Sequence, residues 1–308
     1  MLFSVIIPTY NRGHLLAETL ASVFNQEFQD FEIIVVDDGS TDDTARILER
    51  YGTRVRCFAQ SNCGPAVARN IGIRHACAEY VAFLDSDDLW FPWTLENYRQ
   101  AIARFRRPSF VAGVHQDFTE SEKLKQIPRR EPVFSFYGDY FETADDHVWI
   151  GTCAAAIKRQ LLVETGGFES SSINAEDSDL WLRLGTAPGF VRVLKPPSFG
   201  YRRHPHSAVS FIDRTIRGHE LMIRREMARK YPGGQERSSE RLSIITRHLR
   251  PVSLLCLKTG RLAEAWNIYW RSFSWNLRLA RLRYLTAFPL VALLRHLKGE
   301  RHRPSAVT

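Results

Sequence analysis

An acidic segment directly after an apolar run is the clearest candidate for chemistry in this sequence. Asp85-Ser86-Asp87-Asp88 follows the run from Tyr80 to Leu84. Carboxylates two residues apart at the end of a strand can converge on one hard cation, and Mg²⁺ and Mn²⁺ take such oxygen ligands while also holding substrate phosphates. The alternative is a turn whose aspartates only cap the next helix. The metal interpretation predicts a substrate with a diphosphate leaving group.

A second acidic turn, Val36-Asp37-Asp38-Gly39-Ser40-Thr41-Asp42, has the same order of strand, turn and helix. A carboxylate at the edge of a nucleotide pocket can accept hydrogen bonds from the base or the ribose. Ser40 is placed to cap the helix that follows. The alternative for this segment is turn and capping chemistry alone.

The elements that must position these turns alternate along the first hundred residues. Strands are predicted at Phe3–Pro8, Phe31–Asp37, Val55–Phe58 and Tyr80–Leu84, and helices at His14–Asn25, Asp42–Tyr51 and Ala66–Cys77. This alternation predicts right-handed βαβ units and a parallel sheet. A polar loop follows each strand, and ligands bind at the carboxyl ends of the strands in such sheets. The loops at 9–13, 38–43, 60–65 and 85–88 are therefore expected to meet around one crevice.

Taken in order, the motifs of this sequence resemble those of the family 2 glycosyltransferases with the GT-A fold. They are Pro8-Thr9-Tyr10-Asn11-Arg12, Asp37-Asp38-Gly39-Ser40, Asn62-Cys63-Gly64-Pro65-Ala66, Ala68-Arg69-Asn70-Ile71-Gly72, Asp85-Ser86-Asp87-Asp88, Gly166-Gly167-Phe168 and Glu176-Asp177-Ser178-Asp179-Leu180-Trp181-Leu182-Arg183. The resemblance covers residues 3 to about 213. It implies an inverting, nucleotide-sugar-dependent enzyme with a Rossmann-like α/β fold, a mostly parallel sheet and flanking helices.

The resemblance also implies roles for single residues on the donor side. The nucleotide-binding residues would be Pro8, Thr9, Tyr10, Asn11, Asp38, Arg69, Asp85 and Ser86. Among them, Tyr10 would lie against the base, Asp38 would bond the base, and Arg69 would lie near the diphosphate. Asp87 would be the principal ligand of Mn²⁺ or Mg²⁺, and Asp85 would contact the ribose or join the metal shell.

The catalytic base implied by the resemblance is Asp177, with Glu176 and Trp181 on the acceptor side. A carboxylate there would take the proton of the acceptor hydroxyl during one in-line displacement. The rival interpretation makes Glu176 and Asp177 an acidic pair favoured by a helix N-terminus. His204 stands where related enzymes often place a loop that closes over the diphosphate, which predicts a metal or phosphate contact; the alternative is a surface histidine.

The last third of the chain differs from the rest in charge. We predict two regions, a GT-A domain at 1–213 and a basic, mainly helical region at 214–308. The second carries about 20 Lys and Arg against about 6 Asp and Glu, within a net charge of +8 for the chain. Its basic aromatic helices favour docking on an anionic membrane surface; the alternatives are a homodimer interface and a helical cap on the fold. No nucleic-acid motif accompanies the charge, so nucleic acid is not an expected partner.

Other features restrict the class of protein. The five cysteines show no CxxC spacing, which argues against a disulfide framework and a zinc site. No leader or membrane-spanning segment is predicted, so the expected location is the cytoplasm, with peripheral binding to the inner face of the membrane.

The predicted function is therefore metal-assisted transfer of a sugar from a nucleoside-diphosphate sugar to an acceptor hydroxyl. The acceptor could belong to a surface polysaccharide, a lipid-linked oligosaccharide or a protein glycan. Alternatives are a catalytically inactive nucleotide- or sugar-binding scaffold and a sugar-nucleotide-forming nucleotidyltransferase, although the loop at 9–13 is not the Gly-rich loop that the latter needs. A Rossmann dehydrogenase is disfavoured because no GxGxxG follows the first strand.

Overall fold

The computed structural model describes residues 1–146, 148–171, 173–203 and 212–300, the last five by their backbone alone. Within them, an eight-stranded sheet has the order β3-β2-β1-β4-β9-β6-β10-β8, and a three-stranded sheet has the order β5-β11-β7. In the large sheet only β9 and β8 run against the other strands. The strands are β1 Phe3–Thr9, β2 Phe31–Asp37, β3 Arg56–Ala59, β4 Tyr80–Phe83, β5 Leu89–Trp90, β6 Phe110–Ala112, β7 His115–Phe118, β8 Val133–Tyr137, β9 Ala155–Lys158, β10 Phe190–Lys195 and β11 Phe199–Arg202.

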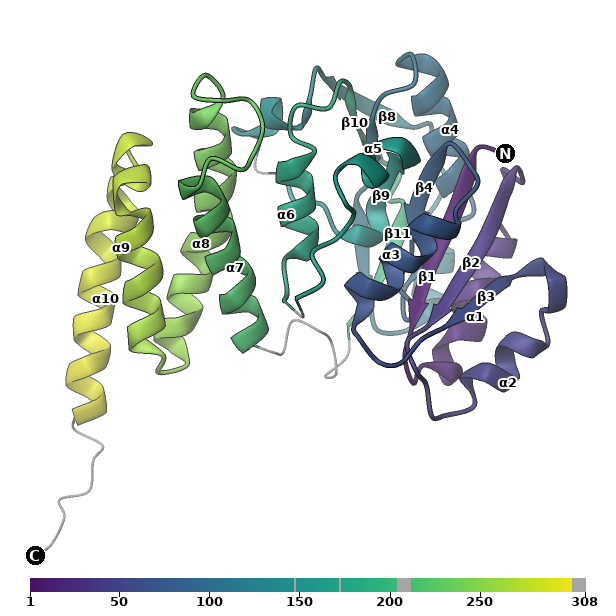
Figure 1. The fold of residues 1–308 in the computed structure, drawn as a ribbon, viewed down its shortest axis with the longest axis horizontal. Helices are drawn as coiled ribbons and strands as arrows, with labels where there is room; N and C mark the ends of the chain where they lie inside the picture. The colour runs from purple at the N-terminus through teal and green to yellow at the C-terminus, as the bar shows by residue number, and fades with distance from the viewer. Residues whose placement is uncertain (147, 172, 204–211, 301–308) are drawn as a thin grey trace, which may run out of the picture.

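Helices cover both faces of the large sheet (Figure 1). They are α1 Gly13–Phe24, α2 Thr44–Glu49, α3 Pro65–His75, α4 Thr94–Arg104, α5 Arg159–Glu164, α6 Glu176–Arg183, α7 Ile212–Met227, α8 Ser238–Lys258, α9 Leu262–Arg278 and α10 Leu282–Glu300. The side chains of β1 point alternately to the two faces of the sheet, and each face has its own layer of helices. Val5 and Ile7 pack with α1 and α4 on one face, whereas Ile6 packs with α3, α5 and α6 on the other.

The predicted fold class, mixed α/β with a mostly parallel sheet, is confirmed. The four predicted strands lie within a residue or two of β1 to β4, since short β-branched runs are a local signal. The helix predicted at Asp42–Tyr51 is shorter, because Asp42 accepts hydrogen bonds from the backbone N–H and hydroxyl of Thr44 at the start of α2. The small sheet was not predicted, and its strand β11 brings Arg202 to the acidic turn after β4.

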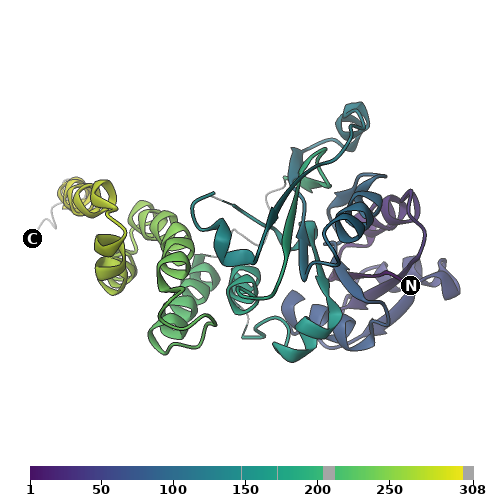
Figure 2. The ribbon, with the colours of Figure 1, turned by 90° about the horizontal axis from the view of Figure 1, so that it is seen from above.

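The helices α7 to α10 form a stack to one side of the large sheet and the helices that cover it (Figure 2). Their apolar side chains continue the same core that covers one face of the sheet, including Met222 of α7 and Ile245 of α8. The predicted boundary between residues 213 and 214 falls inside α7, which begins at Ile212. Among the described residues, no helix combines the length and the apolar character needed to cross a bilayer.

Candidate active site

The acidic turn after β4 is held by side chains from two other segments. A guanidinium nitrogen of Arg12, in the loop after β1, lies 3.2 Å from a carboxylate oxygen of Asp87. The backbone N–H of Arg202 donates to Asp88 Oδ1 at 2.9 Å, and its Nε–H donates to the carbonyl of Asp87 at 2.7 Å. The Arg202 guanidinium also pairs with Glu18 of α1 at 2.6 Å. The turn is therefore rigid before any ligand binds.

Charge at this turn favours a cation. Burial, together with the charges of Asp87 and Asp85, raises the pKa of Asp88 well above its ordinary value. Asp88 Oδ2 is buried and has no hydrogen-bond partner. Ligand atoms of Asp85, Asp88 and Cys153 lie within 4.8 Å of one another. Burial and the neighbouring carboxylates raise the pKa of the Cys153 thiol as well. Among these three groups, carboxylate oxygens are the ligands that suit a hard divalent ion.

Arg69 of α3 joins the acidic turn to α6. Its terminal nitrogens donate to Asp85 at 2.6 Å and to Glu176 at 2.9 Å, and its guanidinium lies over the ring of Phe168. Burial lowers the pKa of Arg69, but the charges of Asp85 and Glu176 outweigh this and the net shift is upward. Both terminal nitrogens are thus occupied, so Arg69 acts in this structure as a clamp; a diphosphate contact stays a prediction.

Asp177 occupies the first turn of α6, next to Glu176. Its carboxylate accepts a hydrogen bond from the backbone N–H of Ser178 at 2.6 Å. Burial and the charge of Glu176 raise the pKa of Asp177 to about 7, although it keeps some solvent exposure. A carboxylate with a pKa near neutrality is suited to accept a proton at physiological pH. The residue before α6, Ala175, has φ +67°, so the backbone is strained where the helix begins.

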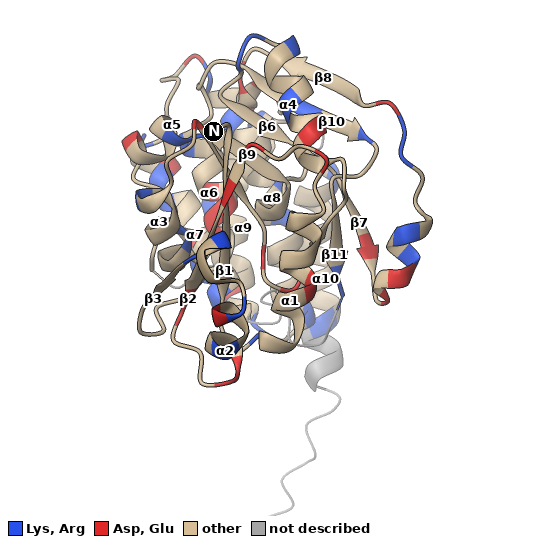
Figure 3. Ribbon diagram, turned by 90° about the vertical axis from the view of Figure 1, so that its right-hand side faces the viewer, with Lys and Arg blue, Asp and Glu red and all other residues tan. Residues whose placement is uncertain are grey.

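The loops after β1 and β2 are joined by Asn11. Its side-chain oxygen accepts from the backbone N–H of Thr41 at 2.7 Å, and its own N–H donates to Ser40 Oγ at 2.9 Å. Asn11 has φ +49°, which asparagine tolerates better than most residues. Thr9 is buried at the strand end, whereas Tyr10 is 43% exposed and free to meet a flat base. Acidic and basic segments alternate around this end of the sheet, near α1 and α2 (Figure 3).

Asp38 is buried and its carboxylate is already bonded to the protein. It accepts from the backbone N–H groups of Cys63 and Gly64, each at 2.8 Å, and from the side chain of Gln60. These bonds fix the loop before α3. The carboxylate therefore shapes the wall of the crevice in this structure, and the predicted bond to a base would have to use its remaining lone pair.

The remaining predicted site residues are Trp181 and His204. Trp181 is 1% exposed, its ring packs on Phe110 and Phe168, and its N–H donates to the carbonyl of Ile150. Trp181 thus lies in the core, one helical turn from Asp177, and the acceptor-side position stays a prediction that this burial does not favour. His204 lies outside the described residues.

α7 and the segment after it support α6. Tyr231 donates to Asp179 at 2.8 Å, and Arg225 forms an ion pair with the same carboxylate. At the start of α6, Asn174 donates to Thr215 Oγ1 at 2.9 Å. A Cβ at Gly218 would overlap the carbonyl oxygen of Asn174, so only glycine lets α7 approach this closely. The position of Asp177 thus depends on residues beyond 213.

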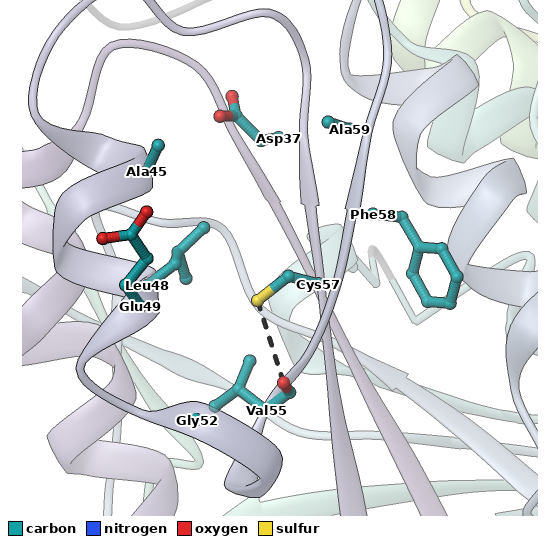
Figure 4. A pocket seen from close by; sticks show the side chains of 9 residues that line it. All are labelled: Asp37, Ala45, Leu48, Glu49, Gly52, Val55, Cys57, Phe58 and Ala59. Carbon is teal, nitrogen blue, oxygen red and sulfur yellow. Dashed lines mark hydrogen bonds between the residues drawn. The ribbon is translucent and has the colours of Figure 1, made fainter.

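A pocket of about 350 Å³ lies between α2 and β3 (Figure 4). Its lining is mostly apolar, and Asp37 and Glu49 are its charged residues. Neither the acidic turn after β4 nor α6 contributes to it. Burial and the charge of Asp37 raise the pKa of the Cys57 thiol, which makes it a poor nucleophile. This pocket is separate from the residues assembled above.

Sequence reasoning missed the roles of Arg12 and Arg202. Arg12 stands inside the first quoted motif, where its cationic side chain next to a strand end was a usable signal. Arg202 lies outside every motif named from the sequence. Its contact with the acidic turn depends on the pairing of β11 with β5, which no local pattern indicates.

A comparison with models of protein families matches residues 4–164 to the model of glycosyl transferase family 2. The chain belongs to this family. An uncharacterized glycosyltransferase of Rickettsia felis is 34% identical over 190 residues, which are 59% of this chain and 30% of that protein. The chain therefore spans about a third of that relative. UDP-Glc:alpha-D-GlcNAc-diphosphoundecaprenol beta-1,3-glucosyltransferase WfgD of Escherichia coli is 37% identical over 185 residues, 59% of this chain and 69% of that protein.

Solved structures of similar fold agree with the family assignment. S. aureus TarS, residues 1–349 in complex with UDP-GlcNAc, has a TM-score of 0.61 at 19% identity and covers 91% of this chain and 92% of that one. The mannosyltransferase PcManGT from Pyrobaculum calidifontis, in complex with GDP-Man and Mn²⁺, has a TM-score of 0.54 at 20% identity and covers 96% of this chain and 86% of that one. At these identities the likeness is one of fold.

Proposed function

We propose that this family 2 member transfers a sugar, with inversion, from a nucleoside-diphosphate sugar to an acceptor hydroxyl. The observation that carries the proposal is the Arg69 clamp, which holds Asp85 of the acidic turn and Glu176 of α6 on one guanidinium. This clamp supports the proposal because Glu176 is the neighbour in sequence of Asp177, the candidate base, and Asp85 belongs to the candidate cation site. Relatives named for nucleotide-sugar chemistry support this assignment.

Each part of the site has a task in this proposal. Asp177 takes the proton of the acceptor hydroxyl as its oxygen attacks the anomeric carbon and the bond to the diphosphate breaks. Asp85, Asp87 and Asp88 would hold Mn²⁺ or Mg²⁺, which neutralises the charge of the departing nucleoside diphosphate. Arg12, whose guanidinium lies 3.2 Å from Asp87, would add positive charge beside that ion and the diphosphate.

Thermal unfolding with a panel of nucleoside diphosphates tests the donor class. A ligand that binds only the folded protein raises the melting temperature, so one base should give the largest rise, and Mn²⁺ should increase it. EDTA should abolish the part that depends on the metal. Equal melting temperatures with and without every nucleotide would contradict the proposal.

Hydrolysis of the donor separates this proposal from the scaffold alternative. A binding scaffold would show the thermal shift but no release of nucleoside diphosphate when Mn²⁺ is present. A transferase releases it slowly to water even without an acceptor. A protein that only binds its ligand has no use for a catalytic base. The candidate base Asp177 therefore favours the enzyme over the scaffold.

For the acceptor side, we propose docking of α9 and α10 on an anionic lipid surface. The large apolar residues exposed on these helices are Trp270, Leu277, Leu282, Leu290, Val291, Leu293 and Leu294. Residues 265–299 contain no Asp or Glu, but they include Arg271, Arg278, Arg283 and Arg295. A second copy of the chain would oppose this surface with like charge, whereas anionic lipid complements it. An acceptor of the polysaccharide or lipid-linked class would be met at such a surface.

Replacing Leu290 and Leu294 with aspartate should lower binding to phosphatidylglycerol vesicles by about tenfold or more, because two exposed anchors are lost and two repelling charges are added. Co-sedimentation at low and high salt measures it, and wild-type binding should fall with salt. Val163→Asp is a matched control, since Val163 is equally exposed but lies on α5. Equal sedimentation of the double variant and wild type would refute lipid docking.

A further inference from the structure

Three arginine side chains act on one another where α8 meets the start of α10. Arg247 and Arg250 belong to α8, and Arg281 directly precedes α10. Arg281 donates to Ser243 Oγ at 3.3 Å, and the Nε–H of Arg250 donates to the carbonyl of Thr246 at 3.1 Å. Burial lowers the pKa of Arg247 and of Arg250, and the charge of Arg281 lowers both further. The fold thus holds three positively charged side chains near one another.

Arg247 has no partner for its charge within the described part of the chain. All three of its guanidinium nitrogens are buried and none makes a hydrogen bond. Elsewhere the chain pairs such groups, since Arg69 binds Asp85 and Glu176, and buried Arg241 binds Glu226. A buried guanidinium without a partner for its charge destabilises a fold. An anion that is not among the described residues would supply the missing partner.

The nearby acids do not supply it. Asp145 and Asp146 act on Arg247 only from a distance, and Asp146 is bonded to the hydroxyl of Tyr137 at 2.6 Å. Neither forms an ion pair with Arg247 among the contacts of the described residues. The three guanidiniums outweigh these exposed carboxylates, so the local field attracts anions.

Tyr140, in the short 3₁₀ turn at Tyr140–Thr143, connects this cluster to the candidate base. Burial raises the pKa of Tyr140 to about 12; the charge of Arg247 opposes that shift and the charge of Asp177 adds to it. Both charged groups therefore lie within electrostatic range of one buried hydroxyl. In the proposed function the acceptor approaches Asp177, and Tyr140 is a neighbour of both that carboxylate and Arg247.

We propose that Arg247, Arg250 and Arg281 bind the phosphate group of a phosphate-bearing acceptor, an inference that rests on the proposed function and names the substrate class. Guanidiniums match phosphate oxygens with paired N–H donors and hold them more strongly than neutral donors do. Leu282, next to Arg281, is exposed and begins the apolar face of α10. A prenyl chain attached to the phosphate would continue onto that face.

Binding of two soluble probes tests the site without the reaction. Inorganic pyrophosphate and geranyl diphosphate should each raise the melting temperature of the wild-type protein. Arg247→Met should weaken both affinities by about tenfold or more, and Arg250→Met by several-fold, because each removes charged donors to phosphate. Arg224→Met, which removes an exposed charge on α7, should respond like wild type. Tighter binding of the prenyl probe would assign a lipid-linked source; equal binding would assign the phosphate alone.

The basal stability of Arg247→Met gives an independent readout. Removing an unpaired buried cation should leave the melting temperature without probes equal or higher. Equal probe responses in wild type, Arg247→Met and Arg250→Met would overturn the phosphate site. Donor hydrolysis should persist in both variants, whereas its absence in wild type would count against the proposed function alone.

Discussion

Asp177→Asn is expected to lower turnover by about 10²–10⁴ while the affinity for the donor changes little. Asparagine keeps the size of the side chain and its contact with Ser178, but it cannot take the acceptor proton. In the wild-type protein the same carboxyl must be ionised to act. Its pKa of about 7 therefore predicts that kcat/KM rises with pH to about 7 and then levels off. Initial rates and calorimetric donor binding on one preparation measure both quantities.

The same variant should be more stable than wild type at alkaline pH. An aspartate has a pKa of about 3.9 in the unfolded chain, so raising it on folding destabilises the ionised protein. The penalty is absent below about pH 4, grows as pH rises, and is complete above about 7. We expect a gain of about 1–3 kcal/mol in unfolding free energy at pH 8 and none at pH 4, after allowance for solvent screening.

Urea unfolding at both pH values measures this difference. Glu236→Gln, which neutralises an exposed carboxylate, is the matched control and should change little. A structural acid at the start of α6 would give the opposite pattern. Its loss would lower stability by about 0.5–2 kcal/mol and leave the turnover of the folded fraction nearly intact, which would remove Asp177 from catalysis.

Asp87→Ala is expected to reduce transfer by about 10³-fold or more and to abolish the metal-dependent part of nucleoside-diphosphate binding. A divalent ion at a developing diphosphate charge contributes several kcal/mol to the transition state. Removing a principal ligand of that ion should forfeit most of that contribution. Initial rates with Mn²⁺ and binding with and without EDTA measure the loss.

Glu122→Ala is the control for Asp87→Ala, because Glu122 is an exposed carboxylate whose ion pair with Lys125 is worth little. It should leave both rate and metal dependence unchanged. Transfer by Asp87→Ala that stays near the wild-type rate in EDTA would exclude this metal assignment. Partial activity that still needs Mn²⁺ would shift the main ligand role to Asp85 and Asp88.

The strands and turns that could be predicted from the sequence are those determined by the residues of a single short segment. Alternating or continuous apolar runs located β1 to β4, and the polar loops after them correctly indicated one edge of the sheet. The acidic turns could be recognised because their aspartates directly follow an apolar run. Pairs distant in sequence, such as Arg12 with Asp87 and Arg69 with Glu176, needed the folded chain.

Trp181 shows a limit of motif reasoning within one helix. It follows Asp177 by four residues, which puts both on one side of α6. One turn is about 5.4 Å long, and over that distance α6 passes from the crevice into the core. Spacing alone gave no sign of this depth. The unpaired charge of Arg247 was likewise invisible, since most arginines of a basic region are solvated.

The close approach of Gly218 to Asn174 also matters for building hybrids of this enzyme. The family model ends at residue 164, so the candidate base Asp177 and the helix α7 that supports α6 both lie outside the segment that the model matches. A hybrid joined at residue 213 would set a foreign side chain against the backbone before α6 and tilt Asp177 away from the acidic turn. The smallest exchangeable unit therefore runs from the first strand through α7 and Tyr231.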